Sequence, residues 1–189
     1  AKASLTVIIS PLVSLMKDQV DVLFNRFNRN EAVALNGILS PPERQEAIER
    51  IEDGTASLLY ISPESLRSAT VMRLLTKRII DRFVIDEAHC FSAWGLDFRV
   101  DYEFIGPFIR LLRKRKMDQR RIPISCFTAT ARPEVVEDIQ HNFLEHLGLE
   151  LKPFITRQAR KNLAYQVIAV QSKEEKFARL VEILSESSG

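Results

Sequence analysis

Two adjacent carboxylates near the middle of the chain are the residues best suited to metal-assisted chemistry. Arg82-Phe83-Val84-Ile85 has the pattern of a strand, and Asp86-Glu87 follow it directly. Mg²⁺ prefers carboxylate and phosphate oxygens as ligands and keeps several of its waters. Asp86 is therefore expected to hold Mg²⁺, directly or through its water. Glu87 is expected to orient or deprotonate a water that attacks a terminal phosphate.

The residues around this pair bear on two alternatives. An Asp-Glu pair alone would also suit two acidic side chains satisfied by a helix N-terminus, but the full Asp86-Glu87-Ala88-His89 tetrad argues against that interpretation. The adjacent His89 and Cys90 raise the question of a zinc site, which needs about four Cys or His ligands. The further candidates are Cys126, His141 and His146. Because the two histidines do not share one helical face, a zinc site is not expected.

Five short apolar runs alternate with helical periods and would position the carboxylates. The runs are 5–9, 32–35, 57–61, 82–85 and 123–127. This alternation predicts an α/β fold, a parallel sheet with helices on both faces, in which ligands bind at the carboxyl ends of the strands. Cap signals mark three helices: Ser10-Pro11 as N-cap and first position, the Ser40–Glu43 capping box, and Gly148 closing a helix over 133–147.

Small or charged residues follow each of the five runs. They are Ser10, Asn36-Gly37, Ser62-Pro63, Asp86-Glu87 and Thr128-Ala129-Thr130. Because the carboxyl ends of parallel strands meet at one edge of a sheet, these clusters predict a single site. Ordinary turn and cap chemistry remains the alternative for Ser10, Asn36 and Ser62 taken singly.

The pattern changes after Phe154. Residues 156–162 are polar and basic and suggest a linker, 163–170 a new strand, and 173–184 a helix with one apolar face. We therefore expect a first domain over residues 1–155, and a linker with the start of a second domain over 156–189.

The composition is that of an ordinary globular protein. The 189 residues are 46% hydrophobic and 28% charged, and the net charge is +2, so charge alone does not indicate a nucleic-acid partner. A basic run (Arg110, Arg113, Lys114, Arg115, Lys116) suits either a solvated helix end or DNA contact. Two unpaired cysteines favour a reducing compartment, and no signal peptide or membrane-spanning run is evident. We expect no membrane association, and a cytoplasmic or nuclear location.

Several of these segments together resemble one protein family. Asp86-Glu87-Ala88-His89 looks like motif II of superfamily 2 helicases, and residues 90–102 (CFSAWGLDFRVDY) resemble the aromatic-rich loop of RecQ helicases. Residues 10–20 (SPLVSLMKDQV) are similar to their motif Ia. Residues 60–64 (YISPE) are similar to motif Ib, and 127–131 (FTATA) to motif III. The resemblance covers nearly the whole chain, with the motifs in the expected order. It implies a RecA-like motor lobe of the P-loop NTPase fold.

The resemblance also implies roles for individual residues. Asp86 would bind Mg²⁺ with ATP, Glu87 would activate water, and His89 would connect the nucleotide site to neighbouring motifs. Thr128 and Thr130 would relay the ATP state. Single-stranded DNA would contact residues in the segments that resemble motifs Ia and Ib and the aromatic loop: Pro11, Leu12, Ser14, Lys17, Ser62, Trp94, Phe98 and Arg99.

The residues of the aromatic loop support DNA contact only weakly by themselves. Trp94 and Phe98 could stack on bases, with Arg99 adding a phosphate or cation–π contact, but both rings would also suit a protein core.

The sequence departs from the family in two respects. Ala93, Leu96, Val100 and Lys161 stand where the family commonly has Gln, His, Pro and Pro. No Gly-x-x-x-x-Gly-Lys-Ser/Thr loop occurs, and the family carries it about 20 residues before the first strand, a length that fits one crossover. We therefore expect this chain to lack its own ATP-binding loop and to be inactive alone.

Three functions are compatible with these patterns. The leading one is part of an ATP-dependent 3′ to 5′ DNA helicase acting on single-stranded and partly duplex DNA. The second is a degenerate lobe that binds single-stranded DNA without unwinding. The third is an RNA remodeller of the same superfamily, which the segment from Cys90 to Tyr102 disfavours.

Overall fold

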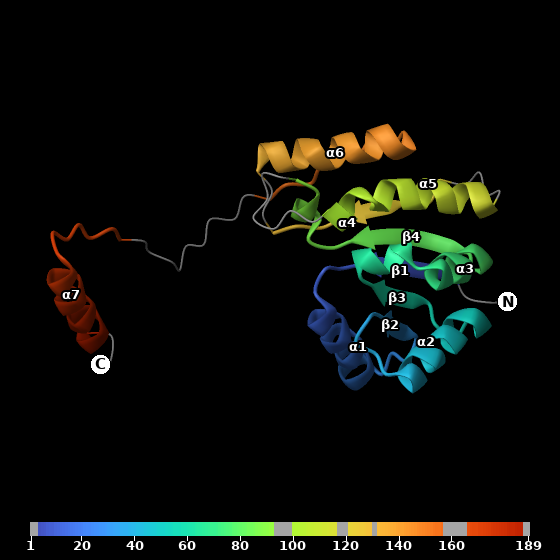
Figure 1. Ribbon diagram of the computed structural model, residues 1–189, viewed down its shortest axis with the longest axis horizontal. Helices are drawn as coiled ribbons and strands as arrows, with labels where there is room; N and C mark the ends of the chain where they lie inside the picture. Colours follow the sequence, from blue (N-terminus) through green and yellow to red (C-terminus); the bar gives the residue numbers. More distant parts are fainter. Residues whose placement is uncertain (1–3, 93–99, 117–120, 130–131, 157–165, 187–189) are drawn as a thin grey trace. The chain divides into compact units, whose positions relative to one another are not determined.

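The computed structural model describes residues 4–92, 100–116, 121–129, 132–156 and 166–186. They fall into two compact units, Ala1–Phe154 and Ile155–Gly189, which are treated separately below (Figure 1).

The first unit is built on a five-stranded parallel sheet. Its strands are β1 (Leu5–Ile9), β2 (Ala32–Leu35), β3 (Leu58–Ile61), β4 (Ile80–Ile85) and β5 (Ile124–Cys126), in the order β2-β3-β1-β4-β5. Every neighbouring pair is parallel, and Ile9 of β1 pairs with both Ile61 and Ile85. The expected parallel α/β fold is confirmed, so all five carboxyl ends lie along one edge.

Helices cover both faces of the sheet. They are α1 (Val13–Phe27), α2 (Pro41–Asp53), α3 (Ala69–Lys77), the short α4 (Val100–Glu103), α5 (Ile105–Lys116) and α6 (Pro133–Leu147). Two 3₁₀ turns, η1 (Pro63–Arg67) and η2 (Ala88–Phe91), follow β3 and β4. The step from β1 to β2 runs opposite to the later steps, so right-handed crossovers put α1 on one face and α2, α3 and α5 on the other.

Burial agrees with this arrangement. Leu5, Val7 and Ile9 alternate along β1 with no exposed surface and join the main core, which also includes residues of α2, α3, α5 and α6. A smaller cluster on the other face joins Met16 of α1 to Ala32 and Tyr60. The main core therefore fixes the strand ends from one side, and α1 packs on the other.

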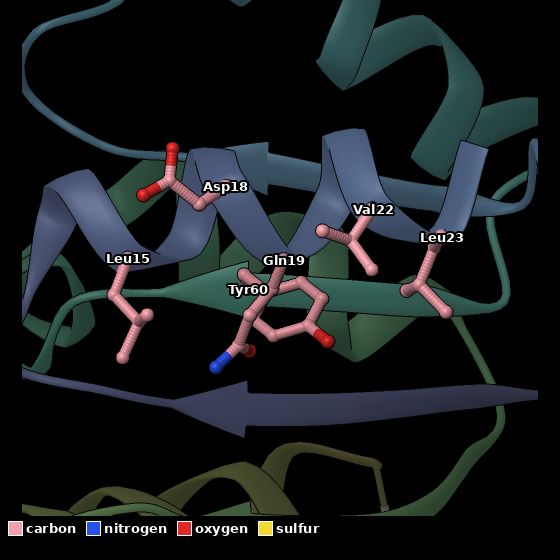
Figure 2. A pocket seen from close by; sticks show the side chains of 6 residues that line it. All are labelled: Leu15, Asp18, Gln19, Val22, Leu23 and Tyr60. Carbon is pink, nitrogen blue, oxygen red and sulfur yellow. The ribbon is translucent and has the colours of Figure 1, made fainter. Parts of the chain in front are cut away.

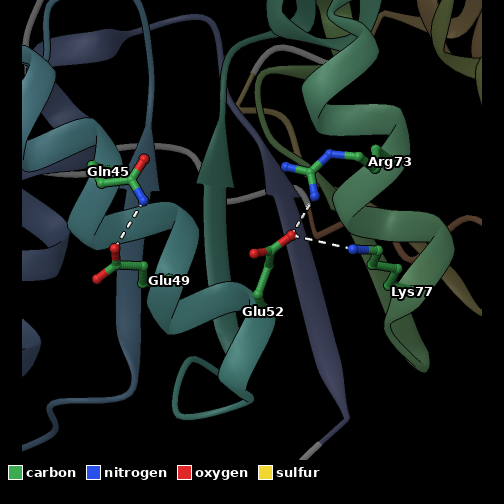
Figure 3. A network of polar contacts seen from close by, with 5 residues as sticks. All are labelled: Gln45, Glu49, Glu52, Arg73 and Lys77. Carbon is green, nitrogen blue, oxygen red and sulfur yellow. Dashed lines mark hydrogen bonds and ion pairs between the residues drawn. The ribbon is translucent and has the colours of Figure 1, made fainter.

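Polar contacts on the surface tie α2 to α3. Glu52 of α2 accepts a hydrogen bond from Arg73 and lies 3.5 Å from the Lys77 ammonium, while Gln45 donates to Glu49 one turn along α2 (Figure 3). The Arg73 hydrogen bond is the main cause that lowers the pKa of Glu52. Because these side chains are exposed, the contacts orient the two helices more than they stabilise the fold.

Helix caps show where the sequence prediction was right and where it was wrong. The capping box forms, with the Ser40 amide donating to Glu43 Oε2 at 2.8 Å, and Gly148 closes α6 with a φ of 63°. The expected start at Ser10-Pro11 is wrong, since α1 begins at Val13 and has Leu12 as its N-cap residue. Ser10 is instead held at the sheet edge, where its hydroxyl donates to Asp86 rather than to a helix amide.

The second unit contains α7 (Lys173–Glu186). The strand expected over 163–170 is not formed in its described part, residues 166–170, and residues 163–165 lie outside the description. A strand exists only through ladder hydrogen bonds to a neighbour, and the described residues of this unit include no other strand to supply them. Within the described residues, no helix is long and apolar enough to cross a membrane.

Candidate active site

Buried polar side chains line the carboxyl edge of the sheet. Ser10, Asn36 and Ser62 are nearly inaccessible and follow β1, β2 and β3. Asn36 Oδ1 accepts the Ile38 amide hydrogen at 3.1 Å, and the Ser62 and Ser65 hydroxyls are 2.9 Å apart. These two contacts belong to local turns, as the alternative interpretation held for Asn36 and Ser62. Ser10 differs, because it reaches across to another strand end.

Asp86 is held by the end of β1, by its neighbour Glu87 and by α4. Its amide donates to the Ile9 carbonyl at 2.9 Å, which extends the β1–β4 ladder by one residue. The Ser10 hydroxyl donates to Oδ2 at 3.2 Å and the Glu87 amide to Oδ1 at 2.9 Å. The Tyr102 hydroxyl donates to the Asp86 carbonyl at 2.8 Å. The carboxylate is half-buried and has one donor on each oxygen among these contacts, so a lone pair of each remains for a cation.

Glu87 has an unusual backbone for a glutamate. Its φ of 48° and ψ of 44° lie in the left-handed region, which costs an L-residue about 1–2 kcal/mol. Hydrogen bonds of its own backbone and of the next residue hold it there: the Glu87 amide donates to Asp86 Oδ1, the Cys90 amide to the Glu87 carbonyl and the Ala88 amide to the Phe127 carbonyl, all at 2.9 Å. Strain of this kind persists where the surroundings over-determine it, and it concentrates at functional sites.

His89 connects Glu87 to the end of β5. Its Nδ1 lies 3.1 Å from Glu87 Oε2 and 3.1 Å from Thr128 Oγ1. His89 is 15% exposed and Glu87 32%, so the imidazole is largely enclosed while the carboxylate reaches solvent. A hydrogen on Nδ1 would face both oxygens, which links a carboxylate able to act as a base to the segment after β5.

The segments after β4 and β5 also join through their backbones. The Phe127 amide donates to the Ile85 carbonyl at 2.8 Å, and the Phe127 carbonyl accepts from Ala88. A displacement of Thr128 would therefore shift the turn that carries Glu87 and His89.

The residues expected to contact DNA divide into three groups. Leu12 is 43% exposed, and Ser14 and Lys17 are exposed on the first turns of α1. Pro11 and Ser62 are buried at the strand ends. Trp94, Phe98, Arg99 and the coupling candidate Thr130 lie outside the described residues.

A shallow pocket lies beside α1. It is lined by Leu15, Asp18, Gln19, Val22 and Leu23 of α1 and by Tyr60 of β3 (Figure 2). Burial, and secondarily the charge of Asp86, raise the pKa of Tyr60. The phenol therefore stays protonated over the physiological range.

Two members of the basic run have structural partners. Lys116 donates to the Thr76 carbonyl at 3.2 Å and to the Arg78 carbonyl, so it caps the end of α3. Arg110 donates to the Glu145 carbonyl at 2.9 Å and to that of His146, at the end of α6. Cations at helix C-termini interact favourably with the helix dipole. Arg113, Lys114 and Arg115 lie in the last turn of α5.

Sequence reasoning missed one residue of the site, since no role was predicted for Tyr102. Ser10 was expected at this edge from the parallel order of the strands, but its hydroxyl was also assigned to a helix cap, and it donates to Asp86 instead. No spacing rule connects Tyr102 with Asp86, since the contact depends on how α4 packs.

Comparison with known proteins identifies the family. Residues 1–139 match the family model described as DEAD/DEAH box helicase. This chain belongs to the DEAD/DEAH box helicase family. Among relatives, it is 38% identical to the probable ATP-dependent DNA helicase RecS of Bacillus subtilis (98% of this chain, 35% of that protein). It is 37% identical to the ATP-dependent DNA helicase RecQ of the same organism (89% and 27%).

The likeness extends to a eukaryotic helicase and to solved structures of the fold. The chain is 37% identical to the ATP-dependent helicase SGS1 of Saccharomyces cerevisiae, over 86% of this chain and 11% of that protein. It superposes on the DUF1998 helicase MrfA bound to DNA and AMPPNP with a TM-score of 0.55 at 18% identity, covering 79% of this chain and 20% of that one. These comparisons and the parallel sheet establish a RecA-like helicase fold. The chain spans about a third or less of the length of the curated relatives it matches.

Proposed function

We propose that this chain is the part of a RecQ-type motor lobe that activates water for ATP hydrolysis and contacts single-stranded DNA. The complete protein would be an ATP-dependent DNA helicase, and relatives named as such support this. By the same resemblance it would move 3′ to 5′ on single-stranded DNA and unwind duplexes. Residues 1–155 would belong to the first lobe and 156–189 to the linker and the start of the second.

The observation that carries the proposal is the Asp86–Glu87–His89–Thr128 arrangement at the ends of β4 and β5. Asp86 and Ser10 supply hard oxygens of the kind that Mg²⁺ prefers, and Asp86 would hold the ion. Bound Mg²⁺ would neutralise charge on the phosphate oxygens of ATP. Glu87, half-exposed and held in a fixed backbone conformation, would take a proton from the attacking water. His89 would keep that carboxylate oriented.

Coupling would follow the contacts of His89. Phosphate release changes the charge next to Glu87, and His89 is in contact with both Glu87 and Thr128. Thr128, with Thr130, would carry that change towards the DNA side. Pro11, Leu12, Ser14, Lys17 and Ser62 would contact the strand, together with Trp94, Phe98 and Arg99. Exposed Lys17 would make such binding dependent on salt.

Substitution of the two carboxylates in the complete protein tests the proposal. Glu87→Gln keeps the size of the side chain but removes the base, so ATP should still bind while turnover falls by about 10²-fold or more. Asp86→Asn should in addition weaken Mg²⁺-dependent ATP binding. Steady-state ATPase assays and nucleotide titration separate the two effects. Wild-type turnover in Glu87→Gln would contradict the assignment. A wild-type protein that binds single-stranded DNA but hydrolyses no ATP would instead be a DNA-binding module.

The 189-residue chain alone is proposed to fold but not to hydrolyse ATP or unwind DNA. Triphosphate binding in this fold uses backbone amides of a Gly-rich loop and a Lys, and this motif is missing from the 189 residues. Asp86 and Glu87 alone repel an anionic nucleotide. Calorimetric titration with Mg²⁺-ATP should therefore give no micromolar binding. Tight binding would show that the nucleotide site lies elsewhere on this chain.

A further inference from the structure

Helix α4 contacts the site through residues for which the sequence analysis predicted no role. Its neighbouring residues Asp101 and Tyr102 contact the segments that follow two different strands. Asp101 Oδ1 lies 2.8 Å from Arg67 Nε, and Arg67 ends η1 after β3. The Tyr102 hydroxyl donates to the carbonyl of Asp86 after β4. The four residues of α4 thus connect the turn that follows Ser62 to Asp86, whose carboxylate is expected to hold Mg²⁺.

The Tyr102 side chain is held rigidly behind Asp86. It has no exposed surface, and its ring packs edge-on against Phe91 at 5.3 Å between centroids. Phe91 in turn packs against Phe143 of α6 at the same distance. Because this aromatic stack fixes the ring, the Tyr102 hydroxyl has a defined position relative to η2 and to Asp86, which lies just before η2.

We propose that Tyr102 is a positioning residue for Asp86, and that its hydroxyl sets the carboxylate in the orientation needed to hold Mg²⁺. This rests on the proposed function. Ser10 holds the side-chain end of Asp86 through Oδ2, while Tyr102 holds the main-chain end through the carbonyl. Two fixed points on opposite sides of the Cα atom leave the carboxylate little freedom to turn.

The same contact gives a route from η1 to the metal site. The Arg67 guanidinium is paired with Asp101 and also lies 4.8 Å from the centre of the Phe104 ring. A movement of η1 therefore pulls on α4, and Tyr102 transmits that movement to the Asp86 carbonyl. A strand bound near Ser62 would in this way alter how firmly Asp86 holds its ion.

Tyr102→Phe in the complete protein tests the proposal, since it removes the hydroxyl and keeps the ring in its aromatic stack. ATPase rates are measured against free Mg²⁺ with saturating single-stranded DNA and ATP. The Mg²⁺ concentration at half-maximal rate should rise by about 2- to 10-fold, as expected for loss of one neutral hydrogen bond. The rate should recover at saturating Mg²⁺. Tyr60→Phe, which removes the hydroxyl of a second buried tyrosine, on β3, should keep the wild-type half-saturation.

The outcomes separate this inference from the proposed function. A wild-type enzyme with DNA-stimulated hydrolysis and an inactive Glu87→Gln variant would support the function. Against that background, unchanged Mg²⁺ half-saturation in Tyr102→Phe would overturn the role of Tyr102. So would a loss of rate that no Mg²⁺ concentration restores while thermal unfolding stays cooperative, because the fold would then be intact and the hydroxyl would act on a step other than Mg²⁺ binding. A wild-type protein without ATPase activity would overturn the function itself.

Discussion

Glu87 offers a test of whether this site stores backbone strain. Among the described residues, positive φ angles occur at Asn28, Gly54, Gly148 and Glu87. Asn and Gly tolerate this conformation, and three of these four positions have one of them. Glutamate does not tolerate it, so its presence indicates that the carboxylate is needed there at a cost in stability.

The size of the strain follows from comparing alanine and glycine at the same position. Both Glu87→Ala and Glu87→Gly lose the carboxylate and its contact with His89, so that loss cancels in the comparison. Glycine relieves about 1–2 kcal/mol of left-handed strain. Glycine also lowers the free energy of unfolding by about 0.4–1 kcal/mol relative to alanine, because it gives the unfolded chain more conformational freedom. Glu87→Gly should therefore be more stable than Glu87→Ala by about 0.8 kcal/mol at the midpoints of these ranges, and by at most about 1.6 kcal/mol.

The same two substitutions at a helical position should give the opposite result, with alanine more stable than glycine. Glu46 is exposed in the middle of α2, where glycine is less stable than alanine by about 1 kcal/mol. Urea unfolding of the 189-residue chain, followed by circular dichroism, measures all four variants. The reasoning fails if glycine is the less stable residue at position 87 as well as at 46. It also fails if either Glu87 variant in the complete protein keeps full ATPase activity.

Three further predictions concern other parts of the chain. Trp94→Ala in the complete protein should reduce DNA-stimulated hydrolysis more than basal hydrolysis, since stacking contributes about 1–3 kcal/mol per base; an equal loss of both rates would count against a DNA contact. Gly106→Ala should destabilise the chain by about 1–3 kcal/mol in urea unfolding, because the new Cβ would lie 2.9 Å from His146 Cβ; an unchanged midpoint would mean that α6 can shift. Burial raises the pKa of Cys126 to about 12, so this thiol should resist alkylation at pH 8 until the chain is unfolded, and rapid native labelling would contradict it.

Much of the fold could be predicted from local patterns. The five strands were found within one or two residues of their observed bounds, because each is a short apolar run between turn residues. The capping box at Ser40 and the closing Gly148 were found because their signals lie within four residues of the helix end. The parallel order then brought the five polar clusters to one edge without further information.

The parts that could not be predicted depend on packing between distant segments. Gly106 and Pro107 both lie in the first turn of α5, where proline is tolerated. Gly106 is there because α6 approaches closely, and its partner His146 lies 40 positions away. Ser10 was predicted to cap a helix because Ser-Pro is a strong local signal. Its hydroxyl donates to Asp86 instead, because a charged carboxylate is a strong hydrogen-bond acceptor.

The proposed site needs the segments that follow β1, β4 and β5 to lie close together. The order of the strands in the sheet explains why they do. β1 lies at the centre of the sheet between β3 and β4, so Ser10 adjoins both the Ser62 turn and Asp86. β5 lies beyond β4, so Thr128 can reach His89. A catalytic base that is active in one nucleotide state and inactive in another needs hydrogen-bond partners on segments that can move relative to each other. The ends of neighbouring parallel strands are such segments above a shared core, and the contacts of Asp86 with Ser10 and of His89 with Thr128 cross between strands in this way. We therefore expect substitutions at these cross-strand contacts to alter coupling before they alter stability.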